Sequence, residues 1–272
     1  MTNRRIHRPS LLTLTMLLAC SGGMEALAED SQAEIAKKLN NPIAAMVSVP
    51  LQLNHDENIG KTDAGERDVL NIQPVVPIDL NADWNIISRT ILPVIQQNDI
   101  PRGTDRSGIG DVLQSLFFSP KAPTAGGWIW GAGPALLLPT ASDELLGGEK
   151  WSAGPTAVIL KQENGWTYGV LANHLWSFAG DGQREDVSAT FLQPILGYTT
   201  ATLTTFSLNS ESTYDWETKE WSVPINLMAT QLFKVGEQPM SIQLGTRYWA
   251  ESPEAGVGGW GWRLTYTLVF RK

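Results

Sequence analysis

His174 and Ser177 are the two neighbouring side chains in this sequence whose types fit nucleophilic chemistry. A serine becomes a nucleophile when a base such as histidine lies within hydrogen-bond reach of its hydroxyl. The surrounding residues alternate between apolar and polar, which predicts a β-strand, and residues three apart on a strand point to opposite faces. The spacing therefore argues against a catalytic pair, and we assign no catalytic residue. His55 lies in a predicted loop, where we expect it to be solvated.

Binding motifs are few. Gly108-Ile109-Gly110-Asp111 and Gly131-Ala132-Gly133 lack the lysine and the strand-to-helix setting of a phosphate loop, so both are interpreted as strand or turn glycines. Acidic residues gather in the predicted loops, where they either hold divalent cations that bridge to anionic lipid headgroups or simply solvate the loops. We favour solvation, and we assign no metal site and no cofactor.

A further set of polar and charged side chains lies opposite the apolar faces of the predicted strands. Alternate residues of a strand point to opposite faces, so an outward apolar face turns these side chains toward the inside of a barrel. There, charged groups control permeation or close the bore through ion pairs. The candidate lumen-lining residues are Arg89, Asp111, Gln193, Glu211, Asn226, Gln243, Arg247 and Arg263.

The last stretch of the chain shows this alternation most clearly. One face carries a charge and two hydroxyls, and the other is large and apolar with aromatic residues at both ends, which is typical of a transmembrane β-strand. The polar face has glycine and valine as its other members. The apolar face consists of Trp260, Trp262, Leu264, Tyr266, Leu268 and Phe270, and the opposite face of Gly261, Arg263, Thr265, Thr267 and Val269.

The whole chain divides into about twelve such segments, and no run of 18 apolar residues predicts a membrane helix. Connections near residues 81–83, 120–126, 162–165, 199–202 and 234–238 are mostly tight. Those at 55–66, 98–108, 140–150, 180–186, 215–220 and 251–259 are longer or richer in glycine and acid. This pattern predicts an all-β fold, a transmembrane antiparallel up-and-down barrel of about 12 strands, polar inside and apolar outside. The competing interpretation is a soluble β-sandwich or lipocalin-like barrel.

Tryptophans support the barrel, because they fall into two groups at the predicted strand ends. Indole prefers the membrane interface, where its ring is in the apolar phase and its N–H is wet. The group beside the tight turns is Trp84, Trp128, Trp130 and Trp166; the group near the long loops is Trp151, Trp176, Trp216, Trp221, Trp249, Trp260 and Trp262.

The N-terminus predicts export. Residues 1–28 have a basic start, an apolar stretch and the small-x-small site Ala26-Leu27-Ala28, as a cleaved signal peptide does; the alternative is lipidation of Cys20, the one cysteine of the chain. Residues 29–41 predict a short periplasmic helix ended by Pro42, either a plug of the barrel or a frayed linker, and residues 42–272 predict the barrel. Cleavage changes the net charge from −8 to −10, which argues against a nucleic-acid partner.

Several motifs carry a family resemblance that covers nearly all of the chain after residue 28. They are Leu39-Asn40-Asn41-Pro42, Asn71-Ile72-Gln73-Pro74-Val75-Val76-Pro77, Trp84-Asn85-Ile86-Ile87-Ser88-Arg89-Thr90, Gly108-Ile109-Gly110-Asp111, Phe117-Phe118-Ser119-Pro120-Lys121 and Ser212-Thr213-Tyr214-Asp215-Trp216. The chain resembles a family of bacterial outer-membrane "transporter" barrels related to the outer-membrane proteins of phenol meta-cleavage (phenol degradation) pathways. The resemblance implies an outer-membrane barrel that passes small, aromatic or hydrophobic compounds, and it supplies no catalytic or binding residues.

The expected location is the outer membrane of a Gram-negative cell envelope. The expected partners are outer-membrane lipid and lipopolysaccharide, the barrel-assembly machinery and a small-molecule solute. The strand ending at Phe270 resembles the C-terminal assembly signal of outer-membrane barrels, except that Arg271 and Lys272 follow. Our first hypothesis is a non-enzymatic, narrow or gated porin-like channel, because twelve strands enclose little more space than eight. The alternatives are an outer-membrane enzyme acting on lipids and a closed barrel with a structural or surface-binding role.

Overall fold

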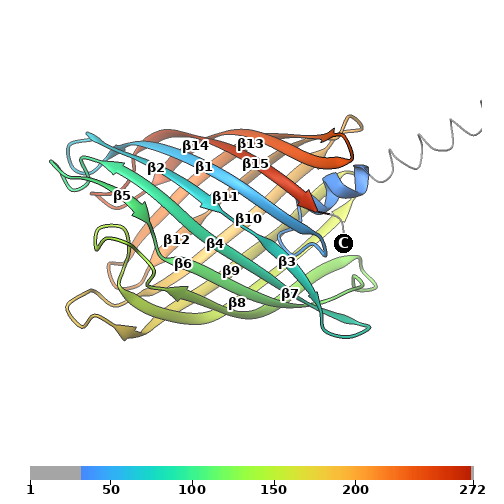
Figure 1. The fold of residues 1–272 in the computed structure, drawn as a ribbon, viewed down its shortest axis with the longest axis horizontal. Coiled ribbons are helices and arrows are strands. Elements are labelled where there is room, and N and C mark those ends of the chain that lie inside the picture. Colours follow the sequence, from blue (N-terminus) through green and yellow to red (C-terminus); the bar gives the residue numbers. More distant parts are fainter. Residues whose placement is uncertain (1–31, 271–272) are drawn as a thin grey trace, which may run out of the picture.

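The structure, a computed structural model, describes residues 32–270, in which one antiparallel sheet closes into a barrel (Figure 1). Neighbours in the sheet follow chain order, and the barrel closes where β1 pairs with β15. The segments are β1 (Val47–Ile59), β2 (Gly65–Ile72), β3 (Val75–Asp79), β4 (Trp84–Asn98), β5 (Asp105–Ile109), β6 (Val112–Pro120), β7 (Trp128–Leu138), β8 (Lys150–Glu163), β9 (Trp166–Gly180), β10 (Ser188–Thr199), β11 (Thr204–Ser210), β12 (Ser212–Asp215), β13 (Glu220–Val235), β14 (Gln238–Glu251) and β15 (Gly259–Phe270).

Three strands are interrupted, so that these fifteen segments make twelve strands. Gln73 and Pro74 separate β2 from β3, Gly110 and Asp111 separate β5 from β6, and Glu211 separates β11 from β12. Proline has no N–H to donate to the ladder, which accounts for the first break. The predicted twelve-stranded antiparallel barrel is confirmed.

The two ends of the barrel differ. The short turns lie at the end where β15 finishes, and the longer loops lie at the other end (Figure 1). Asn164 and Gly165 form one of the two-residue turns at this end, with φ angles of 51° and 82°, the left-handed values of a type I′ hairpin. At the other end, the loops predicted at 55–66 and 98–108 are shorter than expected. Strand pairing continues to Ile59 and from Asp105, beyond the apolar band on which the prediction rested.

The outer surface of the barrel carries the apolar faces of the strands and two girdles of tryptophan. In β15, for example, Trp260, Trp262 and Phe270 are exposed, whereas Arg263 and Val269 on the alternate face are buried. The predicted tryptophan groups are confirmed with one correction. Trp249 points into the barrel, because the strand pleat places it on the same face as the buried Arg247, and its indole N–H donates to Asp56 at 2.9 Å.

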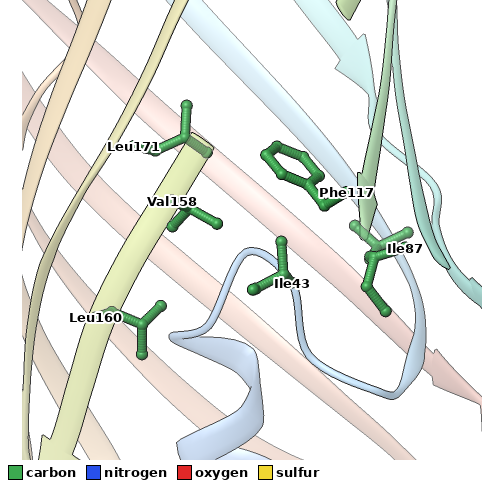
Figure 2. Packing of buried hydrophobic residues seen from close by; sticks show 7 residues of the cluster. Ile43, Ile87, Phe117, Val158, Leu160 and Leu171 are labelled. Carbon is green, nitrogen blue, oxygen red and sulfur yellow. The ribbon is translucent and has the colours of Figure 1, made fainter. Parts of the chain in front are cut away.

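The interior is not uniformly polar, which corrects the expectation of a polar lumen. One side of the lumen is filled by an apolar cluster whose members come from β3, β4, β6, β8, β9 and the segment before β1 (Figure 2). The alternation of β8, which the sequence leaves open, is resolved here: Ser152, Thr156, Val158 and Leu160 face inward. The cluster consists of Ile43, Val75, Ile87, Phe117, Val158, Leu160 and Leu171.

The segment before β1 enters the barrel from the end with the short turns. A helix at residues 32–39 lies across this end, and residues 40–46 turn into the lumen and lead to Val47 (Figure 1). The sequence predicts that the first strand starts at Ile43 on the outer apolar face, but β1 begins at Val47, because Ile43 packs inside the barrel. No helix among residues 32–270 is long and apolar enough to cross a membrane. The predicted signal peptide, residues 1–28, and the first residues of the predicted helix lie outside the described part.

Two apolar contacts hold this segment. Ile43 inserts between Ile87 and Phe117 on one side and the β8 and β9 residues on the other, with 3% of its surface exposed (Figure 2). A second cluster joins the helix residues Ile35 and Ala36 to Leu232 of β13, with Ala44, Met46 and Val269 completing it. The Lys37 carbonyl also accepts a hydrogen bond from the Gln162 side chain at 2.8 Å. We name residues 32–46 the N-terminal segment.

Candidate functional site

The lumen contains a cavity of about 490 Å³ beside the apolar cluster. This lies in the size range of small-molecule sites, which are usually 300–1,000 Å³. Residues 36, 38–42 and 44 of the N-terminal segment form its wall at one end, and inward-facing side chains of the strands form most of the rest. Polar residues line most of the β10 to β15, β1 and β2 side, since that side lacks the apolar cluster. The cavity is therefore the candidate functional site.

An ion pair between Arg263 and Glu211 spans one side of this cavity. The guanidinium donates to both oxygens of the carboxylate, Nη1 at 3.0 Å and Nη2 at 2.7 Å, and its Nε donates to Asn54 at 2.7 Å. Such a two-point contact fixes both side chains in orientation as well as in distance. Glu211 reaches Arg263 from the break between β11 and β12, and Asn54 is the register partner of Arg263 on β1.

A second charged group lies closer to the long loops. Arg247 donates to Asp56 at 3.3 Å, and its guanidinium carbon lies 4.9 Å from the centre of the Trp249 ring. Arg67 is the register partner of Asp56 on β2 and has a buried Nε without a hydrogen-bond partner among residues 32–270. Gly261 makes room for this group, because a Cβ there would lie 2.7 Å from an Asp56 carboxylate oxygen.

Arg89 is the fourth arginine that faces the lumen. It lines the cavity from β4, where the alternation directs it inward, and its Nη2 donates to the Oε1 of Gln73 at 3.2 Å. Gln73 occupies the break between β2 and β3, and Val75 just beyond it is the register partner of Arg89. The partner of this cation is thus a neutral amide.

The other candidate lining residues fall into two groups. Gln193 and Gln243 line the cavity, and Gln243 is held between Thr230 at 2.9 Å and Thr265 at 3.1 Å. Asn226 is fully buried and donates to Asn209 at 2.8 Å. Asp111 lies toward the long loops, where it accepts hydrogen bonds from two backbone N–H groups of the loop between β7 and β8. Asn226, Asp111 and Arg247 are not among the cavity-lining residues.

Neither histidine within residues 32–270 forms a pair with a serine. His174 bonds to the Thr190 hydroxyl at 2.7 Å on the outer face, whereas the Ser177 hydroxyl donates to Asp186 at 3.1 Å. The two side chains thus lie on opposite faces, as their spacing predicts. The prediction that His55 lies in a loop is wrong. His55 lies in β1, forms a hydrogen bond with Asp68 at 2.8 Å, and stacks on the Trp262 ring with the ring centres 5.3 Å apart.

The loops at the long-loop end hold ion pairs. Among residues 32–270, no group of three or more histidine, cysteine, aspartate or glutamate side chains is arranged to hold a metal ion. Lys150 and Ser177 donate hydrogen bonds to Asp186, and these hold the pKa of the Asp186 carboxyl below its usual range. This carboxylate therefore stays charged in mildly acidic solution.

Among the arginine groups described above, four residues were not selected from the sequence: Asn54, Asp56, Arg67 and Gln73. The first three lie where the sequence predicts a loop or a strand end, and Gln73 is adjacent to a proline. One sequence feature does point to them. Polar residues continue to alternate from Gln52 through Asn54 to Asp56, and that period of two extends the inward face of the strand past its apolar end.

Comparisons with known proteins find similarity in structure but not in sequence. The sequence matches no protein-family model and no curated protein. A solved outer-membrane channel from Pseudomonas putida F1 is similar in structure, with a TM-score of 0.64 and 16% identity over 83% of this chain and 96% of that one. Outer membrane phospholipase A from Escherichia coli has a TM-score of 0.48 and 11% identity over 83% and 90% of the chains.

At these identities the likeness shows the fold alone. The closed antiparallel barrel, its outward apolar faces and its tryptophan girdles define a β-barrel of the outer-membrane type. The solved channel to which its fold is similar is an outer-membrane protein.

Proposed function

We propose that this protein is a channel in the outer membrane of a Gram-negative cell that passes small solutes, including aromatic or hydrophobic ones. The observation that carries the proposal is the cavity inside the barrel, which is large enough for a small molecule and is lined by both charged and apolar side chains. A barrel with a purely structural role gains stability from a filled interior, because voids cost packing energy. An open, charged space instead suits a passing solute.

The similarity to a solved outer-membrane channel supports the same proposal. So does the resemblance of the sequence motifs to transporter barrels related to phenol-degradation proteins, which suggests aromatic solutes. The end holding the short turns is then periplasmic, as in other outer-membrane barrels, and the tryptophan girdles lie at the two membrane interfaces.

The N-terminal segment acts in this proposal as the gate. It closes one end of the cavity, and its contacts are those of a docked element: two apolar clusters and a few hydrogen bonds. None of its residues belongs to the sheet, so its release breaks no strand pairing. Opening therefore requires only the loss of these side-chain contacts.

Single-channel conductance in a planar bilayer tests the channel. We expect the mature chain to show rare, discrete current steps, and a chain without residues 29–41 to stay open for longer. The Arg102→Gln variant, in an exposed loop, is the control for loss of one positive charge. A folded, inserted barrel that stays silent in both forms would overturn the proposal.

A further inference from the structure

The cavity carries an excess of positive charge. Three basic side chains and one acidic side chain line it: Lys38, Arg89, Arg263 and Glu211. Both oxygens of Glu211 accept hydrogen bonds from Arg263, so these two charges neutralise each other. Within residues 32–270, Arg89 has the neutral side chain of Gln73 as its hydrogen-bond acceptor and forms no ion pair. Arg89 therefore has no anion in direct contact, and the Glu211 carboxylate, which acts on it through charge alone, is already held by Arg263.

Arg89 is suited to bind an anion that enters the cavity from solution. A guanidinium stays protonated in proteins, and a charge removed from water is costly unless an opposite charge or hydrogen bonds compensate it. Its five N–H donors form a planar fork that matches the two oxygens of a carboxylate. The Nε atoms of Arg67 and Arg247 are enclosed in the protein, whereas Arg89 faces the open cavity, where unused donors can meet a solute.

Apolar side chains lie next to this cation in the same cavity. Ile91 is two residues further along β4 on the same face, and its register partner is Leu113 on β6. Two residues of a strand span about 6.8 Å, which is close to the length of a benzoate ion. Leu175 and Phe191 add apolar surface from β9 and β10. A ligand that satisfies this site has an anionic head and a short apolar body.

We infer that the lumen cavity binds a small organic carboxylate, with the carboxylate on the Arg89 guanidinium and the apolar body against Ile91, Leu113 and Phe191. This inference rests on the proposed channel function and names the class of solute. An inorganic anion would bind the same cation without gaining the apolar contacts. A neutral aromatic molecule would gain the apolar contacts without the charge-assisted hydrogen bonds.

The experiment compares benzoate with benzamide, which has the same ring and a neutral head. Binding of each to the purified mature protein in detergent is measured by isothermal titration calorimetry, and block of the single-channel current is recorded separately. We expect benzoate to bind more tightly than benzamide, and Arg89→Gln to weaken benzoate on the order of tenfold to a hundredfold. Arg89→Lys keeps the charge but loses the fork, so it falls in between. Arg102→Gln binds benzoate like the unaltered protein.

A second variant covers the case in which Arg89→Gln fails to fold. Gln73→Glu changes the present partner of Arg89 into a carboxylate of nearly the same shape. This built-in anion occupies Arg89, so we expect benzoate binding to be lost while the barrel remains folded. Benzamide binding should be unchanged, because its contacts with Ile91 and Phe191 persist.

The outcomes separate the two proposals. Current steps together with benzoate binding that depends on Arg89 support both. Current steps with equal binding of benzoate and benzamide, or with no binding up to the solubility limit, overturn the carboxylate site and leave the channel standing. Benzoate binding that depends on Arg89 in a silent barrel supports the site and overturns the channel. Benzoate binding that neither Arg89→Gln nor Gln73→Glu reduces also overturns the site.

Discussion

Replacing Ile43 by alanine should release the N-terminal segment from the barrel. Ile43 is 3% exposed and packs among Ile87, Phe117 and the apolar residues of β8 and β9 (Figure 2). The substitution removes three carbon atoms, which at about 0.8 kcal/mol each is about 2.4 kcal/mol of transfer free energy. The cavity left behind adds to this, and buried isoleucine-to-alanine changes typically cost about 2–5 kcal/mol.

The lost free energy weakens the docking of the N-terminal segment rather than the stability of the barrel, because Ile43 precedes β1 and takes no part in strand pairing. At about 1.4 kcal/mol per factor of ten, a loss of about 2.4 kcal/mol raises the ratio of undocked to docked segment roughly fiftyfold. The free energy of unfolding of the barrel itself should change little.

Two assays detect the release. Single-channel recordings should show a higher open probability, and trypsin should cleave faster after Lys37 and Lys38, which lie on the exposed side of the helix. Ala45→Ser, in the same segment but exposed, is the matched control and should behave like the unaltered protein. Equal open probability and equal cleavage for Ile43→Ala and the unaltered protein would refute the reasoning that Ile43 anchors the segment.

Three further predictions follow from other contacts. Arg263→Met leaves Glu211 in the lumen without its partner, so denaturant unfolding should show a loss of roughly 3–5 kcal/mol, and adding Glu211→Gln should restore much of it; equal stability of the single and double variants would contradict this. In single-tryptophan variants, brominated lipid should quench Trp260 strongly and Trp249 weakly, because the first faces outward and the second donates to Asp56 inside the barrel; equal quenching would reject that orientation. His174→Ala should leave conductance unchanged, and neither form should hydrolyse lipid, whereas hydrolysis that disappears with His174 would restore the enzyme hypothesis.

The outward surface was the most predictable part of the molecule. Alternation with a period of two depends on the pleat of each strand alone, so the exposed face of β15 from Trp260 to Phe270 follows from local sequence. Asn164-Gly165 likewise predicts its hairpin from the conformational preferences of two residues. Trp249 differs from its group because the preference of indole for the interface does not decide whether the ring faces the lipid or the lumen. The strand pleat directs Trp249 inward, where Asp56 accepts its indole N–H.

The candidate site was only partly predictable. The inward direction of Arg89, Glu211 and Arg263 is a property of their own strands, but Asp56 was assigned to a loop and Arg67 lies between that loop and the apolar pattern of the next strand. Their place in the lumen depends on pairing between β1 and β2 that continues beyond the membrane band. The apolar side of the lumen was unexpected for a similar reason. The sequence does not assign Val158 and Leu160 to a face, because both faces of β8 are apolar or small, and the structure turns them inward, where Ile43 packs against them.

By itself, the sequence determined the twelve strands, the face that every strand except β8 turns outward and several of the charges available inside, because these depend on residues two apart or on single turns. Only the tertiary structure decided how those charges pair, where the N-terminal segment lies and how much of the lumen stays open. Each of these depends on contacts across a closed barrel. Arg263 meets Glu211 and Ile43 meets Phe117 over separations that no local pattern encodes.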